Sequence, residues 1–104
     1  MVHASAAHGS QQRVLAIGEV LWDALPAGLF LGGAPLNVAC HLQQLNAHVH
    51  FASRVGDDEL GREISRRFPR KGIASDLLQC DSDLPTGFVV VQLDGLLLLS
   101  ISLF

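Results

Sequence analysis

Apolar, strand-like runs alternate with helix-like spacing along this sequence, and their order limits the fold more than any other feature. Residues 14–17 form an aliphatic run that stops at a glycine, which is typical of a buried strand in a parallel sheet. A helix is expected from Pro35, because proline suits the first helical turn. Apolar residues then recur with helical spacing at Val38, Leu42 and Leu45, with Ala39 beside them.

A second strand and a second helix follow the first pair. Val49 and Phe51 alternate with histidines, as in a strand with one exposed face. Asp57 and Asp58 offer an N-cap for a helix that Pro69 helps to end. The expected buried stripe of this helix comprises Leu60, Ile64 and Phe68. Strand, helix, strand and helix in this order predict an α/β fold with at least one βαβ unit.

Shorter segments complete the expected secondary structure. Residues 27–33 form an apolar piece between glycines, which predicts a short strand. Residues 73–85 are expected to form a loop and a short edge strand. Residues 86–95 are rich in β-branched side chains and end in Asp-Gly, which predicts a strand closed by a tight turn.

Composition divides the chain into segments of different character. Residues 1–12 lack the apolar core of a secretory signal and are expected to form a disordered leader. Residues 13–95 carry the α/β pattern. Residues 96–104 form an uncharged apolar tail, which is too short to span a bilayer. With 104 residues, 49% hydrophobic and 16% charged, the chain is apolar for one small domain. Either much of it is buried against something else, or it is part of a larger fold.

Charge and cysteine content argue against several functional classes. The net charge of −3 argues against a general affinity for nucleic acid. Most basic residues cluster in residues 62–71, which we interpret as the exposed face and basic end of a helix, with a phosphate or nucleic-acid patch as the alternative. The 2 cysteines have no ligand-like spacing, which indicates a reduced, cytoplasmic chain without a metal site.

Polar residues and glycines near the expected strand ends are candidates for a binding site. Asp23 follows the first strand, and ligands of open α/β sheets bind beyond the carboxyl ends of strands. Its carboxylate could accept hydrogen bonds from sugar hydroxyls or hold a cation, or it could be an ordinary loop acid. Asn37 could hold a hydroxyl or be a plain residue of a first helical turn. Gly32 and Gly33 either adopt unusual φ angles or let a ligand touch the backbone.

Arg54 lies just beyond the second expected strand, and it allows two interpretations. It could reach an anionic substrate, or it could form an ion pair with Asp57 or Asp58, which is the favoured interpretation. The chain contains no phosphate-binding loop, nucleophile elbow or zinc motif. These residues therefore indicate a polar site without defining a reaction.

Four segments in a fixed order add a resemblance to a known family. They read GEVLWD, GGAPLNVACHLQQL, SRVGDDELG and PTGFVVVQLDG. Together they resemble the N-terminal part of the PfkB (ribokinase-like) carbohydrate kinases, and most of all the fructokinase branch. The resemblance implies a Rossmann-like α/β body with a small β-sheet lid, and a sugar bound between them. Residues 27–33, 77–80 and 86–93 would build the lid and its junction with the body.

The resemblance also implies roles for the candidate residues. Asp23 and Asn37 would hydrogen-bond the sugar hydroxyls. Gly32 and Gly33 would bring the backbone against the sugar, and Arg54 would lie near the substrate. The implied substrate is a sugar, with fructose favoured over ribose, adenosine or another ketose.

The family transfers the γ-phosphoryl group of ATP to a sugar hydroxyl with Mg²⁺, and the resemblance implies these cofactors. In the family the general base and the anion-binding amides come from a C-terminal GAGD-type motif, which is absent from this sequence, and the ATP pocket is C-terminal too. We therefore assign no catalytic residue, and we expect this chain to be inactive alone. The alternative is a truncated isoform, with the resemblance ending near Gly95. It would bind sugar weakly, associate with a full-length kinase, or form a homo-oligomer through lid strands.

Overall fold

The computed structural model describes residues 2–5, 11–90, 93–94 and 97–98, and it confirms the α/β fold class. The main sheet contains β1 (Val2–Ser5), β2 (Arg13–Ile17), β5 (His48–Gly56), β6 (Ile73–Ala74) and β7 (Leu78–Asp81). Strands β2, β5 and β6 are parallel, whereas β1 runs antiparallel to β2. Strand β7 pairs in parallel with the last residues of β5. The connections from β2 to β5 and from β5 to β6 each pass through a helix, as βαβ units require.

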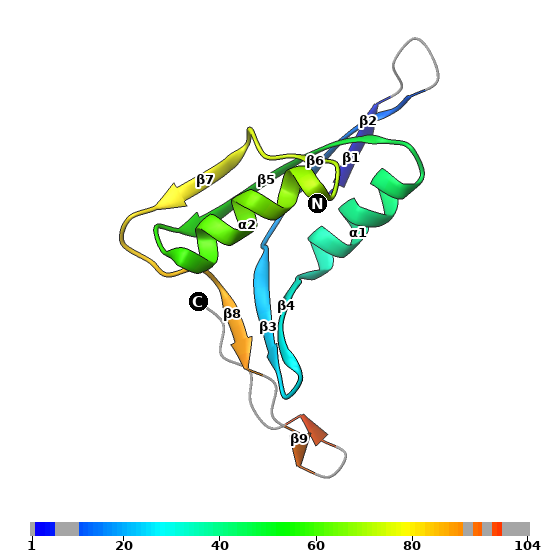
Figure 1. Ribbon diagram of the computed structural model, residues 1–104. Helices are drawn as coiled ribbons and strands as arrows, with labels where there is room; N and C mark the ends of the chain where they lie inside the picture. The colour runs from blue at the N-terminus through cyan, green and yellow to red at the C-terminus, as the bar shows by residue number, and fades with distance from the viewer. Residues whose placement is uncertain (1, 6–10, 91–92, 95–96, 99–104) are drawn as a thin grey trace.

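Helices α1 (Ala34–Gln44) and α2 (Glu59–Arg70) pack against the main sheet (Figure 1). The predicted alternation in β5 is confirmed, because Val49 and Phe51 are completely buried while His48 is exposed. The Phe51 ring meets Phe68 of α2 edge to face, with 5.5 Å between ring centroids. Since the buried residues of both helices and of the sheet belong to one cluster, the body has a single core.

A second, smaller sheet projects from the body, and we call it the lid sheet. It contains β4 (Gly28–Gly32), β3 (Leu21–Leu25) and β8 (Phe88–Val90), with β3 in the middle. Strands β3 and β4 form an antiparallel hairpin, whereas β3 and β8 are parallel. In Figure 1 the lid sheet extends away from both helices toward the bottom of the view. A hairpin of β9 (Leu93–Asp94) and β10 (Leu97–Leu98) follows β8 in the chain.

Trp22 fastens the lid sheet to the body. It belongs to β3 of the lid sheet, yet its side chain is 2% exposed and lies in the core of the body. The indole Nε1 donates a hydrogen bond of 3.1 Å to the Leu60 carbonyl in α2. The guanidinium carbon of Arg67 lies 4.9 Å from the centre of the indole ring, within the range of a cation–π interaction. The start of β3 is therefore part of the body core.

The apolar residues of α1 are buried to different degrees. Val38 is 45% exposed and Leu45 is 78% exposed, whereas Leu36 and Ala39 are buried. Of the residues with the predicted helical spacing, Ala39 is in the core and Leu42 packs against it. The helix places Ala39 against the sheet because its small side chain permits close approach, and Leu45 lies at the C-cap, where the helix has already ended.

In α2 the predicted face is confirmed, since Ile64 and Phe68 are completely buried and Leu60 packs against the same core. Asp58 is its N-cap residue, as one of the two predicted candidates. Pro69 lies inside the helix and does not end it, because the helix continues to Arg70.

The terminal segments differ in part from the expectations. Residues 2–5 form β1 and do not belong to a disordered leader, because their backbone pairs with the edge of β2 and needs no apolar pattern to do so. Residues 6–10 lie outside the described part of the chain. Where one strand was expected over 86–95, the structure describes two short strands, β8 paired with β3 and β9 paired with β10. Within the tail over 96–104 it describes only β10.

Candidate functional site

Asp23 and Gly32 are neighbours across the lid hairpin. Asp23 follows the strand β2, as expected, and lies within the next strand, β3, which pairs with both β4 and β8. The alternative of an ordinary loop acid is therefore wrong. A Cβ atom at position 32 would collide with Oδ2 of Asp23. The missing side chain of Gly32 therefore leaves room for the Asp23 carboxylate, so the structure brings two candidate residues together.

Gly33 joins the lid sheet to α1 and is the N-cap of that helix. Its φ of 110° is a conformation that residues with side chains rarely adopt, and a Cβ there would lie 3.0 Å from the Glu19 carbonyl oxygen. For Gly33 the conformational interpretation is therefore confirmed. For Gly32, whose φ is not positive, the reason is the carboxylate of Asp23.

Asn37 stands one turn into α1. Its backbone N–H donates a 3.0 Å hydrogen bond to the Gly33 carbonyl, which is the first bond of the helix. Its side chain is exposed and has no hydrogen-bond partner in the described part of the chain. Asp23, Gly32, Gly33 and Asn37 therefore all belong to the corner where the lid sheet meets the N-terminus of α1.

Arg54 lies near the carboxyl end of β5, and its partner is Asp81. The distance from Arg54 Nε to Asp81 Oδ2 is 3.4 Å. The favoured ion pair with Asp57 or Asp58 is wrong, because β7 pairs alongside β5 and brings its last residue next to Arg54. Asp57 instead pairs with Arg62 of α2.

Asp81 is a fixed anion because the following loop folds back onto it. The backbone N–H groups of Asp83 and Leu84 donate hydrogen bonds of 2.8 Å and 3.2 Å to Asp81 Oδ1. These bonds, from Asp83 first, lower the pKa of Asp81, and the positive charge of Arg54 lowers it further. The carboxylate therefore remains charged beside Arg54.

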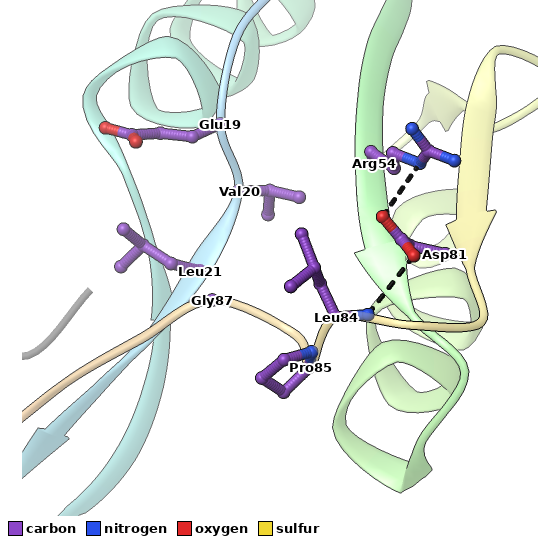
Figure 2. A pocket seen from close by; sticks show the side chains of 8 residues that line it. All are labelled: Glu19, Val20, Leu21, Arg54, Asp81, Leu84, Pro85 and Gly87. Atoms are coloured by element: carbon purple, nitrogen blue, oxygen red, sulfur yellow. Dashed lines mark hydrogen bonds and ion pairs between the residues drawn. The ribbon is translucent and has the colours of Figure 1, made fainter. Parts of the chain in front are cut away.

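A cavity of about 150 Å³ lies between β3, the end of β5 and the loop before β8, as Figure 2 shows. Its lining comprises Glu19, Val20, Leu21, Arg54, Asp81, Leu84, Pro85 and Gly87. Figure 2 also shows that Glu19 lies on the opposite side of the cavity from the ion pair between Arg54 and Asp81, and that its carboxylate points away from that pair. The lining includes Arg54 and none of the other candidate residues. Ligand pockets usually enclose about 300–1,000 Å³, so this cavity alone is small for a sugar site.

A second cavity, of about 290 Å³, shares Arg54 with the first. It lies over the carboxyl ends of β2 and β5, and its lining includes Ile17, Gly18 and Ser53. This is the edge of a parallel sheet at which α/β proteins bind their ligands. Arg54 therefore lines both cavities, at the carboxyl edge of the main sheet.

Asp58 and Thr86 form a buried network that sequence reasoning missed. Thr86 is 2% exposed, and its hydroxyl accepts a 2.9 Å hydrogen bond from the Gly56 N–H. Asp58 accepts a 2.8 Å hydrogen bond from the Gly61 N–H at the start of α2. A Cβ at Gly56 would lie 2.5 Å from the Thr86 nitrogen, so the glycine permits this close approach. The sequence signal that could have pointed to Thr86 is the segment PTG, which belongs to one of the four segments that carry the family resemblance.

The network also changes the acidity of Asp58. Desolvation raises the pKa of this carboxyl, but hydrogen bonds from the Thr86 hydroxyl, the Thr86 N–H and the Gly61 N–H outweigh it. Together with the positive charge of Arg62 they lower the pKa below its ordinary value of 3.8. Asp58 is therefore a charged structural group, and its position as N-cap leaves it no role as a proton acceptor.

Comparison with known proteins identifies the family of this chain. The sequence model described as pfkB family carbohydrate kinase matches residues 19–96. The chain belongs to this family. The match begins just before the lid hairpin and includes all five candidate residues, from Asp23 to Arg54.

Curated relatives and solved structures of this family agree with the fold. A fructokinase of Vibrio alginolyticus is 40% identical over 63 residues, which cover 61% of this chain and 20% of that protein. A fructokinase of Klebsiella pneumoniae is 32% identical over 88 residues, which cover 80% of this chain and 29% of that protein. A double mutant of the Vibrio cholerae fructokinase, crystallised with fructose, ADP and potassium, superposes with a TM-score of 0.73. It is 28% identical, and the match covers 90% of this chain and 31% of that one.

The chain spans less than a third of the length of these relatives. Among the residues that the structure describes, no helix is long and apolar enough to cross a membrane. Within the same residues, no three His, Cys, Asp or Glu side chains gather in a way that could hold a metal ion. These residues therefore offer no cluster that fits the Mg²⁺ that the resemblance implies.

Proposed function

We propose that this chain is the N-terminal, sugar-binding portion of a fructokinase-like carbohydrate kinase and that it transfers no phosphate by itself. The observation that carries the proposal is the contact between the Asp23 carboxylate and Gly32, at the corner where the lid sheet meets α1. Fructose is the proposed sugar, since a fructokinase crystallised with fructose matches most of this chain and curated relatives are fructokinases. A cytoplasmic location is part of the same proposal.

The corner offers complementary groups for a polyhydroxylated ligand. The Asp23 carboxylate accepts hydrogen bonds from hydroxyls, whereas the exposed amide of Asn37 both donates and accepts. Helix α1 has no side-chain cap and no acid in its first turn, so N–H groups at its N-terminus remain available to ligand oxygens. These groups would orient the sugar, and orientation supplies much of the rate in phosphoryl transfer.

Arg54 is proposed to stand at the edge of this site. Its Nε faces Asp81, which leaves the two terminal nitrogens of the guanidinium for a ligand. ATP and Mg²⁺ are proposed as cofactors of the whole kinase on the basis of family membership. The residues that would hold them are proposed to belong to a part of the kinase other than residues 1–104.

Titration of the chain with fructose tests the sugar site. Replacing Asp23 with Asn should weaken fructose binding about tenfold or more, because a hydrogen bond to a charged group contributes roughly 1.5–3 kcal/mol. Asp83→Asn makes the same chemical change in an exposed loop and should leave the affinity unchanged. Equal fructose affinities of wild type and Asp23→Asn would show that Asp23 does not bind the sugar. In a kinase assay with fructose and Mg-ATP, sugar-dependent release of ADP by this chain would contradict the proposed inactivity.

The alternative function is association through the lid sheet, either with a second copy or with a full-length kinase. Strand β4 is an edge strand of the lid sheet, and its Leu29 and Phe30 are 49% and 48% exposed. An unpaired edge with large apolar side chains favours pairing between chains. Light scattering should show an oligomer that Phe30→Glu reduces to a monomer. Leu45→Glu, a matched change at an exposed apolar residue of the body, should leave the oligomer intact.

A further inference from the structure

The basic segment at the end of α2 divides into two groups with different surroundings. The first group is neutralised by acidic side chains of the same region and comprises Arg62, Arg66 and Arg67, whose partners are Asp57, Glu59 and Glu63. The second group is Arg70 and Lys71, which have no acidic partner in the part of the chain that the structure describes. Arg70 and Lys71 are exposed at the basic end of α2, as that interpretation predicted, and they differ from the first group in having no ion pair within the described residues.

Arg70 and Lys71 line a common cavity of about 450 Å³. Its lining comprises Cys40, Gln43, Gln44, Pro69, Arg70, Lys71 and Gly72. The lining contains two cations and two side-chain amides but no carboxylate. Its volume falls within the roughly 300–1,000 Å³ that is usual for sites of small molecules.

One wall of this cavity depends on a glycine, Gly72, which leaves room for a neighbouring side chain. Gly72 has a φ of 73°, and a Cβ there would lie 2.5 Å from Nε2 of Gln43. The amide of Gln43 therefore rests directly over the backbone of Gly72, where only glycine leaves room for it. This contact connects α1 with the end of α2 and holds an amide group beside the two cations.

Helix dipoles do not cancel the positive charge of the cavity. Both helices end here, and each C-terminus carries about −0.5 of an elementary charge. The last carbonyls of α2 already accept hydrogen bonds from the N–H groups of Lys71 and Gly72, and those of α1 are bonded to residues 45–47 in the same way. Two full side-chain charges against about one negative charge from the two helix ends leave a net positive site.

We propose that this cavity binds a small phosphate-bearing molecule through Arg70, Lys71 and the amides of Gln43 and Gln44. Arginine offers paired N–H donors and lysine a compact charge, and both suit phosphate oxygens. The side-chain amides donate to the remaining oxygens. The site uses none of the residues assigned to the sugar, so it stands or falls separately from the proposed function.

Protection of Cys40 from alkylation tests this site in the intact chain. Cys40 lines the cavity, whereas Cys80 is exposed on β7 and serves as an internal control. Inorganic phosphate should slow the reaction of Cys40 with uncharged iodoacetamide about tenfold at a concentration ten times the Kd, because about one site in eleven is then empty. Sodium chloride at equal ionic strength should not. Unchanged Cys40 reactivity, or equal slowing at Cys80, would overturn the proposal without any variant being needed.

Two double variants show which charges are responsible. Arg70→Gln with Lys71→Gln should abolish the protection of Cys40 by phosphate. Arg62→Gln with Arg66→Gln removes the same amount of charge from α2, at residues that are already ion-paired, and should keep the protection. Circular dichroism is the control that checks whether both double variants are folded. Protection that survives in the first pair, or is lost equally in both, would contradict the assignment to Arg70 and Lys71.

Discussion

The hydroxyl of Thr86 donates a 2.5 Å hydrogen bond to Oδ1 of Asp58, although 28 residues separate the two in the chain. Oδ2 of the same carboxylate accepts the Thr86 N–H at 2.9 Å. Asp58 also begins α2, and Thr86 directly precedes the segment that leads into β8. One carboxylate thus caps a helix of the body and holds the strand that completes the lid sheet.

Replacing Asp58 with Ala should lower the free energy of unfolding by about 1–2 kcal/mol, as expected for the loss of an N-cap with further buried bonds. Urea denaturation measures the change. Asp57→Ala is the control, since it removes only an exposed ion pair with Arg62 and should cost about 0–1 kcal/mol. Equal losses for the two variants would show that Asp58 is not the structural cap.

Thr86→Val keeps the shape of the side chain but removes its hydroxyl. The Gly56 N–H then loses its acceptor in a buried place, which should cost about 1–3 kcal/mol of stability. Thr86→Ser retains the hydroxyl and should be the more stable of the two variants in thermal unfolding. A valine variant as stable as the serine variant would mean that the hydroxyl contributes nothing.

Acid should destabilise the chain through Asp58. Its pKa in the folded state lies below the ordinary value of 3.8, so the folded state binds this proton less readily than the unfolded state. Its contribution to stability is therefore complete above pH 3.8 and is lost as the pH falls through the lowered pKa. Unfolding curves across this range should show a smaller loss for Asp58→Asn than for wild type. Parallel curves would assign the acid sensitivity to other carboxyls, such as Asp81.

Gly33→Ala should strain the junction between the lid sheet and α1. Its φ of 110° disfavours any side chain, and the Glu19 carbonyl leaves little room for one. The expected cost is about 1–3 kcal/mol of stability. Asn37→Ala changes an exposed side chain of the same helix and should stay within about 0.5 kcal/mol of wild type in the same denaturation experiment. A neutral Gly33→Ala would show that the junction relaxes easily.

Local patterns are sufficient to predict several elements of this protein. The buried face of β5, the N-cap at Asp58 and the face of α2 with Ile64 and Phe68 all follow from residues within a few positions of one another. Such features depend on strand alternation, helical periodicity and capping, which act along the chain. The α/β class follows from their order, and the family motifs extend the prediction to a lid.

The failures concern contacts that depend on how distant segments pair. The sequence pattern correctly places Asp23 beyond the first strand, but only pairing with β4 and β8 makes the segment of Asp23 a strand of its own. The partner of Arg54 is decided by the alignment of β7 with β5, and no local pattern encodes that register. Likewise, the face that α1 buries depends on which side chain lets the helix approach the sheet, and Ala39 does so better than Val38.

Sequence alone therefore established the order of elements, their periodic faces, the candidate residues and the family resemblance, because each is written in short segments. Tertiary structure decided which candidates meet. It placed the Asp23 carboxylate over Gly32, paired Arg54 with Asp81, and separated Arg70 and Lys71 from the neutralised arginines of the same segment. These outcomes depend on backbone register and on the space left by glycines, which arise only when remote segments pack together.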